Sequence, residues 1–239
     1  MRVAWTLVTG GAKGLGADLC HTLAKEGYSI AVHYNRSEKE ALEVVKHCQA
    51  FGVEAVAIQG DFSSLDSLLD FTGRYVKQFP DTRHLINNVG NYLIKSAVLT
   101  EVDEWMALFQ TNLHTPFVLI KELLPSLTNL KGQIINIGIC GLETHQARTY
   151  STAYSMTKAG LLMLTRSLAK ELAPQGVRVN MISPGHLSTS INLPEACKLP
   201  MGRPATCWEV SRVAAFLLHP DSAYLTGQNI EVAGGVGLS

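Results

Sequence analysis

The chain has 239 residues, of which 46% are hydrophobic and 17% are charged, and its formal net charge at pH 7 is zero. This length and apolar fraction predict one globular domain and exclude a disordered chain. The zero net charge, without a Lys/Arg cluster, argues against nucleic-acid and membrane-surface partners. Five scattered cysteines without a Cys-x-x-Cys pair argue against a disulfide framework or a metal site and favour a reducing cytoplasm.

Short apolar runs alternate with longer amphipathic stretches. The runs are continuous and rich in Val and Ile, as is typical of strands buried on both faces of a parallel sheet. We expect strands at 3–9, 28–34, 53–59, 84–88, 132–138, 177–183 and 229–233, and helices at 14–26, 37–51, 64–78, 101–127, 151–173 and 206–218. The repeated strand–helix order predicts βαβ units in a doubly wound α/β fold. An irregular stretch at about 186–205 is predicted to be a lid over a ligand.

A glycine-rich segment, TGGAKGLG, lies between the first expected strand and the first expected helix. Gly10, Gly14 and Gly16 allow the backbone to turn tightly and to approach a pyrophosphate, and the free N–H groups of the following helix point at that anion. The spacing is Gly-x-x-x-Gly-x-Gly, and an ordinary tight turn is the simpler alternative. Because a strand precedes the segment and a helix follows it, we predict a dinucleotide-binding loop.

The end of the second expected strand, HYNRS, indicates which dinucleotide is bound. An NAD-binding chain places Asp or Glu here to hold the ribose 2′-hydroxyl, but this segment has no carboxylate. Arg36 can pair with a 2′-phosphate, Asn35 and Ser37 can add hydrogen bonds, and Lys13 in the glycine loop can reach the same group. The segment therefore favours NADPH over NADH.

Tyr154 and Lys158 lie four residues apart and project from one face of an expected helix. A tyrosine titrates near ~10, but a nearby ammonium or an oxidised nicotinamide favours its phenolate. This pair predicts the reduction of a carbonyl, in which NADPH supplies the hydride and Tyr154 supplies the proton. A chance Tyr and Lys on an exposed helix is the alternative.

These motifs resemble the classical short-chain dehydrogenases/reductases over essentially the whole chain. The matching segments are Thr9–Gly16, Gly60-Asp61-Phe62, Asn87-Asn88-Val89-Gly90, Asn112, Tyr154 with Lys158, Ser183-Pro184-Gly185 with Thr189, Thr226-Gly227-Gln228 and Gly234-Gly235. The resemblance implies a single Rossmann domain over 1–239, with helices on both faces of a seven-stranded parallel sheet in the order 3-2-1-4-5-6-7. It also implies NADP(H) as the cofactor and a homotetramer or homodimer.

The resemblance assigns a role to each matching residue. Asn112 would anchor a water that relays protons to Lys158, and Lys158 would also hold the nicotinamide ribose. The remaining cofactor-binding residues would be Leu15 in the glycine loop, Asp61 and Phe62 at the adenine, Asn88 and Gly90 along the cofactor, and Pro184, Gly185, Leu187 and Thr189 at the nicotinamide. For Asn88, a purely structural hydrogen bond is an equally good interpretation.

One member of the family's catalytic set, a serine upstream of the tyrosine, is missing. Counting from the strand, the family's Ile-Ser-Ser aligns with Ile137-Gly138-Ile139, so Ile139 takes the place of the serine. Counting back from Tyr154 by the family's usual spacing reaches Gly141 instead, and neither position has a hydroxyl. We expect Ile139 and its neighbour Cys140 to line the substrate pocket.

Three nearby residues are candidates to replace the serine, namely Cys140, whose thiol is a weak donor, Thr144 and Ser151. Without a replacement, the loss of one hydrogen bond to the developing oxyanion costs about 10²–10³ in rate. The site would then be slow but not inactive, because Tyr154 can still donate a hydrogen bond and the proton.

Three functions stay open at this point. The first is an NADPH-dependent carbonyl reductase similar to β-ketoacyl-carrier-protein reductases, although Gln175 stands where those enzymes usually have a basic residue for the acidic carrier; Lys131 is retained. The second is a pteridine or heterocycle reductase, a partial likeness that rests on HYNRS and the absent serine. The third is a non-catalytic NADPH sensor or subunit.

Overall fold

The computed structural model describes residues 3–144 and 147–238. Seven parallel strands form one sheet in the order β3-β2-β1-β4-β5-β6-β7. They are β1 (Trp5–Val8), β2 (Ser29–Tyr34), β3 (Ala55–Gln59), β4 (Thr82–Asn87), β5 (Gln133–Ile137), β6 (Arg178–Pro184) and β7 (Asn229–Val232). The predicted Rossmann-type fold and its strand order are confirmed, and the strands deviate from the expected ranges by only a few residues at their ends.

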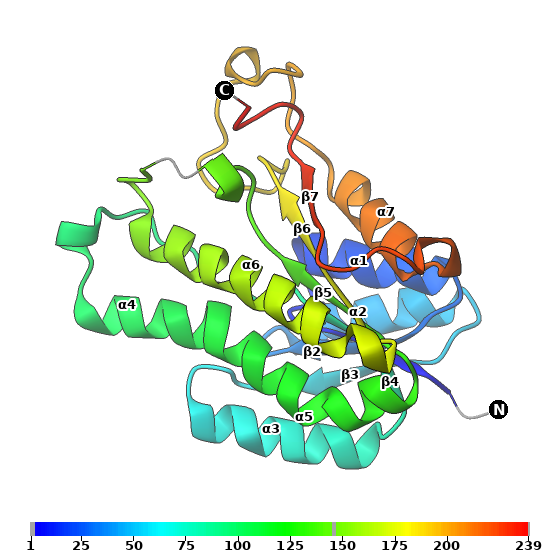
Figure 1. The fold of residues 1–239 in the computed structure, drawn as a ribbon. Coiled ribbons are helices and arrows are strands. Elements are labelled where there is room, and N and C mark those ends of the chain that lie inside the picture. Colours follow the sequence, from blue (N-terminus) through cyan, green and yellow to red (C-terminus); the bar gives the residue numbers. More distant parts are fainter. Residues whose placement is uncertain (1–2, 145–146, 239) are drawn as a thin grey trace.

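Helices cover both faces of this sheet (Figure 1). They are α1 (Gly14–Lys25), α2 (Glu38–Gln49), α3 (Leu65–Gln78), α4 (Val102–Phe109), α5 (Thr115–Asn129), α6 (Thr152–Leu172) and α7 (Cys207–Leu218). One hydrophobic core lies under α1, α2 and α7, and a second lies under α3, α5 and α6. The two cores explain why the strands are apolar on both faces.

The predicted helix 101–127 is divided into three parts. A π-helical segment, Gln110–His114, joins α4 to α5, and Asn112 lies inside it. Such bulges occur frequently at functional sites. The sequence pattern could not reveal the division because the apolar period continues through it.

A chain of buried amides fixes α6 against the centre of the sheet. The side-chain amide of Asn87 on β4 donates to Asn136 Oδ1 on β5 over 2.8 Å, and Asn136 Nδ2 donates to Thr165 Oγ1 on α6 over 2.8 Å. All three residues are buried. Since buried polar groups are costly unless they are paired, this network holds α6 at a defined position on the sheet.

The segment 186–205 is irregular, as expected, apart from a short 3₁₀ turn at Ala196–Lys198. Backbone hydrogen bonds from Ala205 N to His186 O and from Ser188 N to Ala205 O, each 2.9 Å, close its base. In Figure 1 it projects beyond the carboxyl ends of β6 and β7, beside the C-terminal residues. It therefore stands over the edge of the sheet where parallel α/β folds bind ligands.

Within residues 3–144 and 147–238, no helix has both the length and the apolar character that crossing a membrane requires. Nor do these residues contain a group of three or more His, Cys, Asp or Glu side chains with the geometry of a metal site.

Candidate active site

The glycine loop lies at the carboxyl end of β1 and leads directly into α1. A Cβ atom on Gly16 would lie 2.0 Å from the carbonyl oxygen of Gly10, so the close packing of the loop on the helix requires glycine. Gly10 and Gly14 have φ angles of +62° and +52°, which also favour glycine. Leu15 is partly buried in the first turn of α1. This backbone fits a pyrophosphate at the helix N-terminus.

The residues that the sequence assigned to a 2′-phosphate lie together. A cavity of about 370 Å³ is lined by Gly10, Lys13, Asn35, Arg36 and Ser37, with Ala12 and Tyr34. Lys13 Nζ pairs with Glu40 Oε1 at 2.7 Å, on an exposed surface. A surface pair of this kind is worth ~1 kcal/mol or less, so Lys13 can exchange partners.

A buried histidine connects this cavity to the adenine side, and sequence reasoning assigned it no role. His33 Nδ1 accepts from the Gly10 N–H over 3.0 Å, and His33 Nε2 lies 3.2 Å from the Gly60 carbonyl oxygen. With both bonds, the ring is neutral and carries its proton on Nε2. Burial lowers the pKa of His33 to about 4, which keeps this form at neutral pH. The ring also stacks on Phe62 at 4.1 Å.

The residues expected at the adenine and its ribose hold one another in place. Asp61 Oδ1 accepts from Asn35 Nδ2 over 3.3 Å and from the Ser63 N–H over 3.0 Å, at the end of β3. Asn88 Nδ2 donates to Thr9 O over 2.9 Å and to Gly10 O over 3.3 Å. Asn88 thus makes structural hydrogen bonds of the kind that the sequence left open, and its contact with a cofactor stays a prediction.

The predicted catalytic residues meet at the carboxyl end of β5. Lys158 is buried, and its Nζ donates to Ile137 O over 2.8 Å and lies 5.8 Å from the centre of the Tyr154 ring. Asn112 Oδ1 accepts from the Asn91 N–H over 2.8 Å, and its amide donates to Asn91 O over 2.9 Å. Gly90 lies beside both groups, since a Cβ built on it would be 3.4 Å from Lys158 Nζ and 3.5 Å from Asn112 Oδ1.

The pKa directions correct one expectation about this pair. Burial raises the pKa of Tyr154 above its ordinary value, with a further rise from Tyr92, a decrease from Arg148 and a small rise from Cys140. The sequence argument had Lys158 lowering that pKa, but burial outweighs any such effect. Burial also lowers the pKa of Lys158 to about 8. Tyr154 therefore holds its proton at neutral pH, as a proton donor requires.

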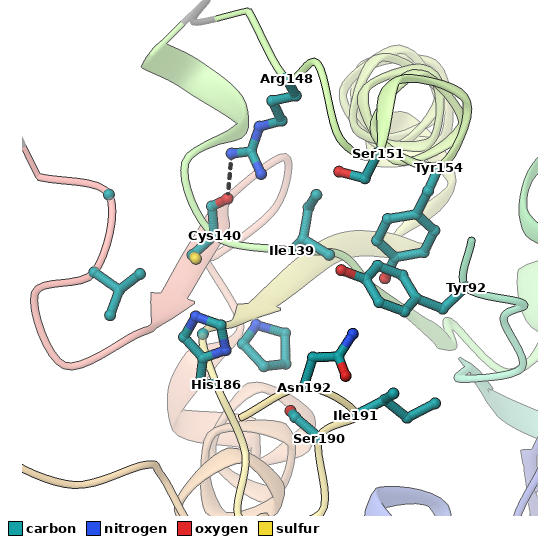
Figure 2. A pocket seen from close by; sticks show the side chains of 14 residues that line it. Tyr92, Ile139, Cys140, Arg148, Ser151, Tyr154, His186, Ser190, Ile191 and Asn192 are labelled. Carbon is teal, nitrogen blue, oxygen red and sulfur yellow. Dashed lines mark hydrogen bonds between the residues drawn. The ribbon is translucent and has the colours of Figure 1, made fainter. Parts of the chain in front are cut away.

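A cavity of about 590 Å³ opens in front of Tyr154 (Figure 2). Its lining includes both residues predicted for the substrate pocket, Ile139 and Cys140, together with Pro184 and Gly185 from the end of β6. Segment 186–205, the predicted lid, contributes His186, Ser190, Ile191 and Asn192, and further polar side chains come from Tyr92, Arg148 and Ser151. Sequence reasoning missed Tyr92, Arg148 and Asn192, because no motif marks them.

The other two residues expected at the nicotinamide are in the lid but do not line this cavity. The Leu187 N–H donates to Ser190 Oγ over 2.9 Å, which forms a turn at the start of the lid. Thr189 is exposed, and its hydroxyl lies 3.7 Å from Cys207 Sγ at the N-terminus of α7.

The position that the count from the strand assigns to the missing serine has an apolar side chain in the cavity wall. Ile139 faces the cavity beside Cys140 (Figure 2). At the preceding position, a Cβ on Gly138 would lie 2.6 Å from Ser183 Oγ and 2.7 Å from Met181 Sδ. Gly138 therefore has no room for a side chain, and any hydroxyl restored here must come from position 139.

Of the three candidate replacements, Cys140 and Ser151 line the cavity, and Thr144 does not. The Thr144 hydroxyl donates to Gly141 O over 2.9 Å. Ser151 Oγ lies 3.3 Å from Ser155 Oγ. Burial raises the pKa of the Cys140 thiol, so it is a neutral and weak donor.

Comparisons with known proteins agree with this geometry. Residues 4–197 match the family described as short chain dehydrogenase. The chain is 32% identical to the 3-oxoacyl-[acyl-carrier-protein] reductase FabG of Staphylococcus aureus (strain N315), and the match covers 96% of each protein. It is 33% identical to the uncharacterized oxidoreductase YmfI of Bacillus subtilis (strain 168), over 96% of this chain and 97% of YmfI.

Two solved structures have the same fold. A blue fluorescent protein from a metagenomic library, in complex with NADPH, has a TM-score of 0.90 and 30% identity, covering 99% of this chain and 98% of its own. The acetoin dehydrogenase YohF from Salmonella typhimurium has a TM-score of 0.91 and 25% identity, covering 100% of this chain and 97% of its own.

Proposed function

Because the chain belongs to the short-chain dehydrogenase family, we propose that it is an NADPH-dependent reductase of ketones of the 3-oxoacyl type. The observation that carries the proposal is the meeting of three features at one edge of the sheet. These are a glycine loop shaped for a pyrophosphate, the buried Lys158 beside Tyr154, and a cavity of about 590 Å³ in front of Tyr154. The reductase FabG, named above, supplies the substrate class.

The chain's residues fit NADP(H). Arg36, Asn35 and Ser37, which line one cavity, would hold the 2′-phosphate, and Gly10, Gly14 and Gly16 would admit the pyrophosphate. Pro184 and Gly185 border the nicotinamide side of the substrate cavity. When bound, the reduced nicotinamide supplies the hydride.

Tyr154 donates its proton to the carbonyl oxygen as the carbonyl carbon is reduced. Its raised pKa favours the protonated phenol, which is the form that reduction consumes. Lys158 stabilises the phenolate that is left, because its ammonium lies over the ring. Asn112 holds the loop after β4 through Asn91 and keeps the path to Lys158 open for a water relay.

The lid and the assembly complete the proposal. Segment 186–205 acts as a substrate lid, since four of its residues line the cavity.

Subunits associate as a homotetramer or homodimer, and the exposed Val102 and Met106 on α4, 76% and 56% accessible, belong to the contact surface. The reductase works in the cytoplasm, in keeping with its five free cysteines.

The test is NADPH oxidation by the purified protein against 3-oxoacyl thioesters, diketones and dihydropteridines. Each thioester is offered both as a carrier-protein conjugate and as a small-molecule thioester. We expect turnover of the 3-oxoacyl compounds and slower turnover with NADH. Turnover of dihydropteridines alone would contradict the substrate class, and tight NADPH binding without any turnover would contradict the reductase itself.

A further inference from the structure

The catalytic cavity lacks a hydroxyl on the β5 side, where Ile139 stands, but it has a second tyrosine on the opposite side. Tyr92 lies on the loop that follows β4 and lines the same cavity as Tyr154. The two rings meet edge to face, with 4.7 Å between centroids and 82° between planes. Figure 2 shows both hydroxyls directed into the cavity, with Ile139 and Asn192 nearby.

The Tyr92 hydroxyl is available for a ligand. Within residues 3–144 and 147–238 it has no hydrogen-bond partner, and the side chain is half exposed. Its charge is the second-largest cause of the raised pKa of Tyr154. This effect has the direction expected for two hydroxyl groups in one cavity, where the edge-to-face ring geometry places them.

Three other donors that line the cavity, on Arg148, Ser151 and Cys140, are weaker or already occupied, while His186, Ser190 and Asn192 line it from segment 186–205. An Arg148 guanidinium nitrogen is held on Cys140 O over 2.7 Å, and Ser151 shares its hydroxyl with Ser155. The Cys140 thiol is a weak donor. Thr144 donates to the backbone outside the cavity.

We propose that the Tyr92 hydroxyl donates the second hydrogen bond to the substrate carbonyl oxygen and so takes the role of the missing serine. This inference rests on the proposed reductase function. Tyr92 keeps its own proton throughout. Tyr154 transfers its proton to the oxygen, and Tyr92 stabilises the negative charge that develops there while the hydride arrives at carbon.

The kinetic test uses Tyr92→Phe, which removes one oxygen and keeps the ring. We expect kcat/KM for the best ketone to fall about 10²-fold, the usual effect of losing one donor to a developing oxyanion. NADPH affinity and the thermal midpoint should stay close to those of the wild type, because the side chain is half exposed and does not line the cavity of Lys13 and Arg36. The matched control is Tyr150→Phe, the same change at an exposed tyrosine that does not line the cavity, which should change kcat/KM less than about threefold.

Rescue separates a donor from a wall residue. In the Tyr92→Phe background, Ile139→Ser returns a hydroxyl to the site. The double variant should have a kcat/KM at least tenfold higher than that of Tyr92→Phe, on the scale of one oxyanion donor. A Tyr92→Phe rate within about twofold of the wild-type rate would overturn the proposal, since a donor costs far more. Equal gains from Ile139→Ser with and without Tyr92 would also overturn it.

A binding measurement keeps the inference distinct from the function on which it rests. Calorimetry follows the ketone binding to the protein–NADP⁺ complex, which holds no hydride and cannot reduce it. Tyr92→Phe should weaken this binding about fivefold, the net effect of one neutral hydrogen bond. Equal binding by both proteins would refute the role of Tyr92. No ketone binding by the wild type would contradict the proposed function, and with it the role of Tyr92.

Discussion

His33 should make the protein sensitive to mild acid. In the unfolded chain a histidine has a pKa of about 6.5, whereas burial lowers the pKa of His33 in the fold to about 4. Between these values the unfolded state binds more protons than the folded state, so the free energy of unfolding falls as pH falls. His33 is only 2% exposed, which justifies the use of the full shift.

The size of the effect follows from linkage. Between pH 7 and pH 5, His33 alone should lower the free energy of unfolding by about 2 kcal/mol. His84 has a pKa lowered to about 3 by burial, with smaller contributions from Arg83 and Arg178, and adds a loss of about 2 kcal/mol over the same interval. The stabilisation that depends on keeping both histidines neutral is complete above about pH 6.5. It is lost as the pH falls from there to the folded pKa, about 4 for His33 and about 3 for His84.

The assay is urea unfolding at pH 7 and pH 5 of the wild type, His33→Gln and the exposed control His219→Gln. His33→Gln will itself lower stability, because Gly10 loses an acceptor, so only the difference between the two pH values is compared. That difference should shrink by about 2 kcal/mol in His33→Gln and stay unchanged in His219→Gln. An unchanged difference in His33→Gln would refute the reasoning.

Three further predictions concern the cofactor and the missing serine. Arg36→Ala should raise the Kd for NADPH about 10- to 100-fold by fluorescence titration, through loss of a charge-assisted hydrogen bond. Equal losses for NADH would contradict the 2′-phosphate assignment. Gly16→Ala should abolish NADPH binding, because the added Cβ would lie 2.0 Å from a backbone oxygen. A Cβ on Gly14 would have no atom within 4 Å, so Gly14→Ala should bind NADPH measurably more tightly than Gly16→Ala does. Ile139→Ser should raise kcat, but by less than it does in the Tyr92→Phe background, because Tyr92 already supplies one donor to the oxyanion. Gly138→Ser should lower the thermal midpoint through its contact with Ser183. No gain from Ile139→Ser would mean that the pocket needs no hydroxyl there.

The strand positions and the grouping of the cofactor residues could be predicted because they depend on local patterns, whereas the strand order followed from the family resemblance. Continuous Val and Ile runs mark strands with both faces buried, and the glycine spacing marks a loop that must approach an anion. HYNRS identified Arg36 from charge alone, and Arg36 does share a cavity with Lys13. The ion pair between Lys13 and Glu40 was not foreseen, because it depends on how α2 is placed beside the loop.

Features that depend on tertiary contacts could not be predicted. The role of His33 requires Gly10 and Gly60 to meet around its ring. The upward shift in the pKa of Tyr154 comes from burial, which the spacing of Tyr154 and Lys158 does not reveal. Tyr92 shows no motif, and only the packing of the loop after β4 against α6 brings its ring to Tyr154.

The most direct test of the account is turnover by Tyr154→Phe beside Tyr150→Phe, a matched change on an exposed tyrosine four residues upstream. With NADPH and the best ketone, we expect Tyr154→Phe to lose turnover while its NADPH Kd stays within about twofold, because the lost proton donor serves chemistry and not cofactor binding. Tyr150→Phe should behave as the wild type. Substantial turnover by Tyr154→Phe would contradict the account, since the proton would then come from another group.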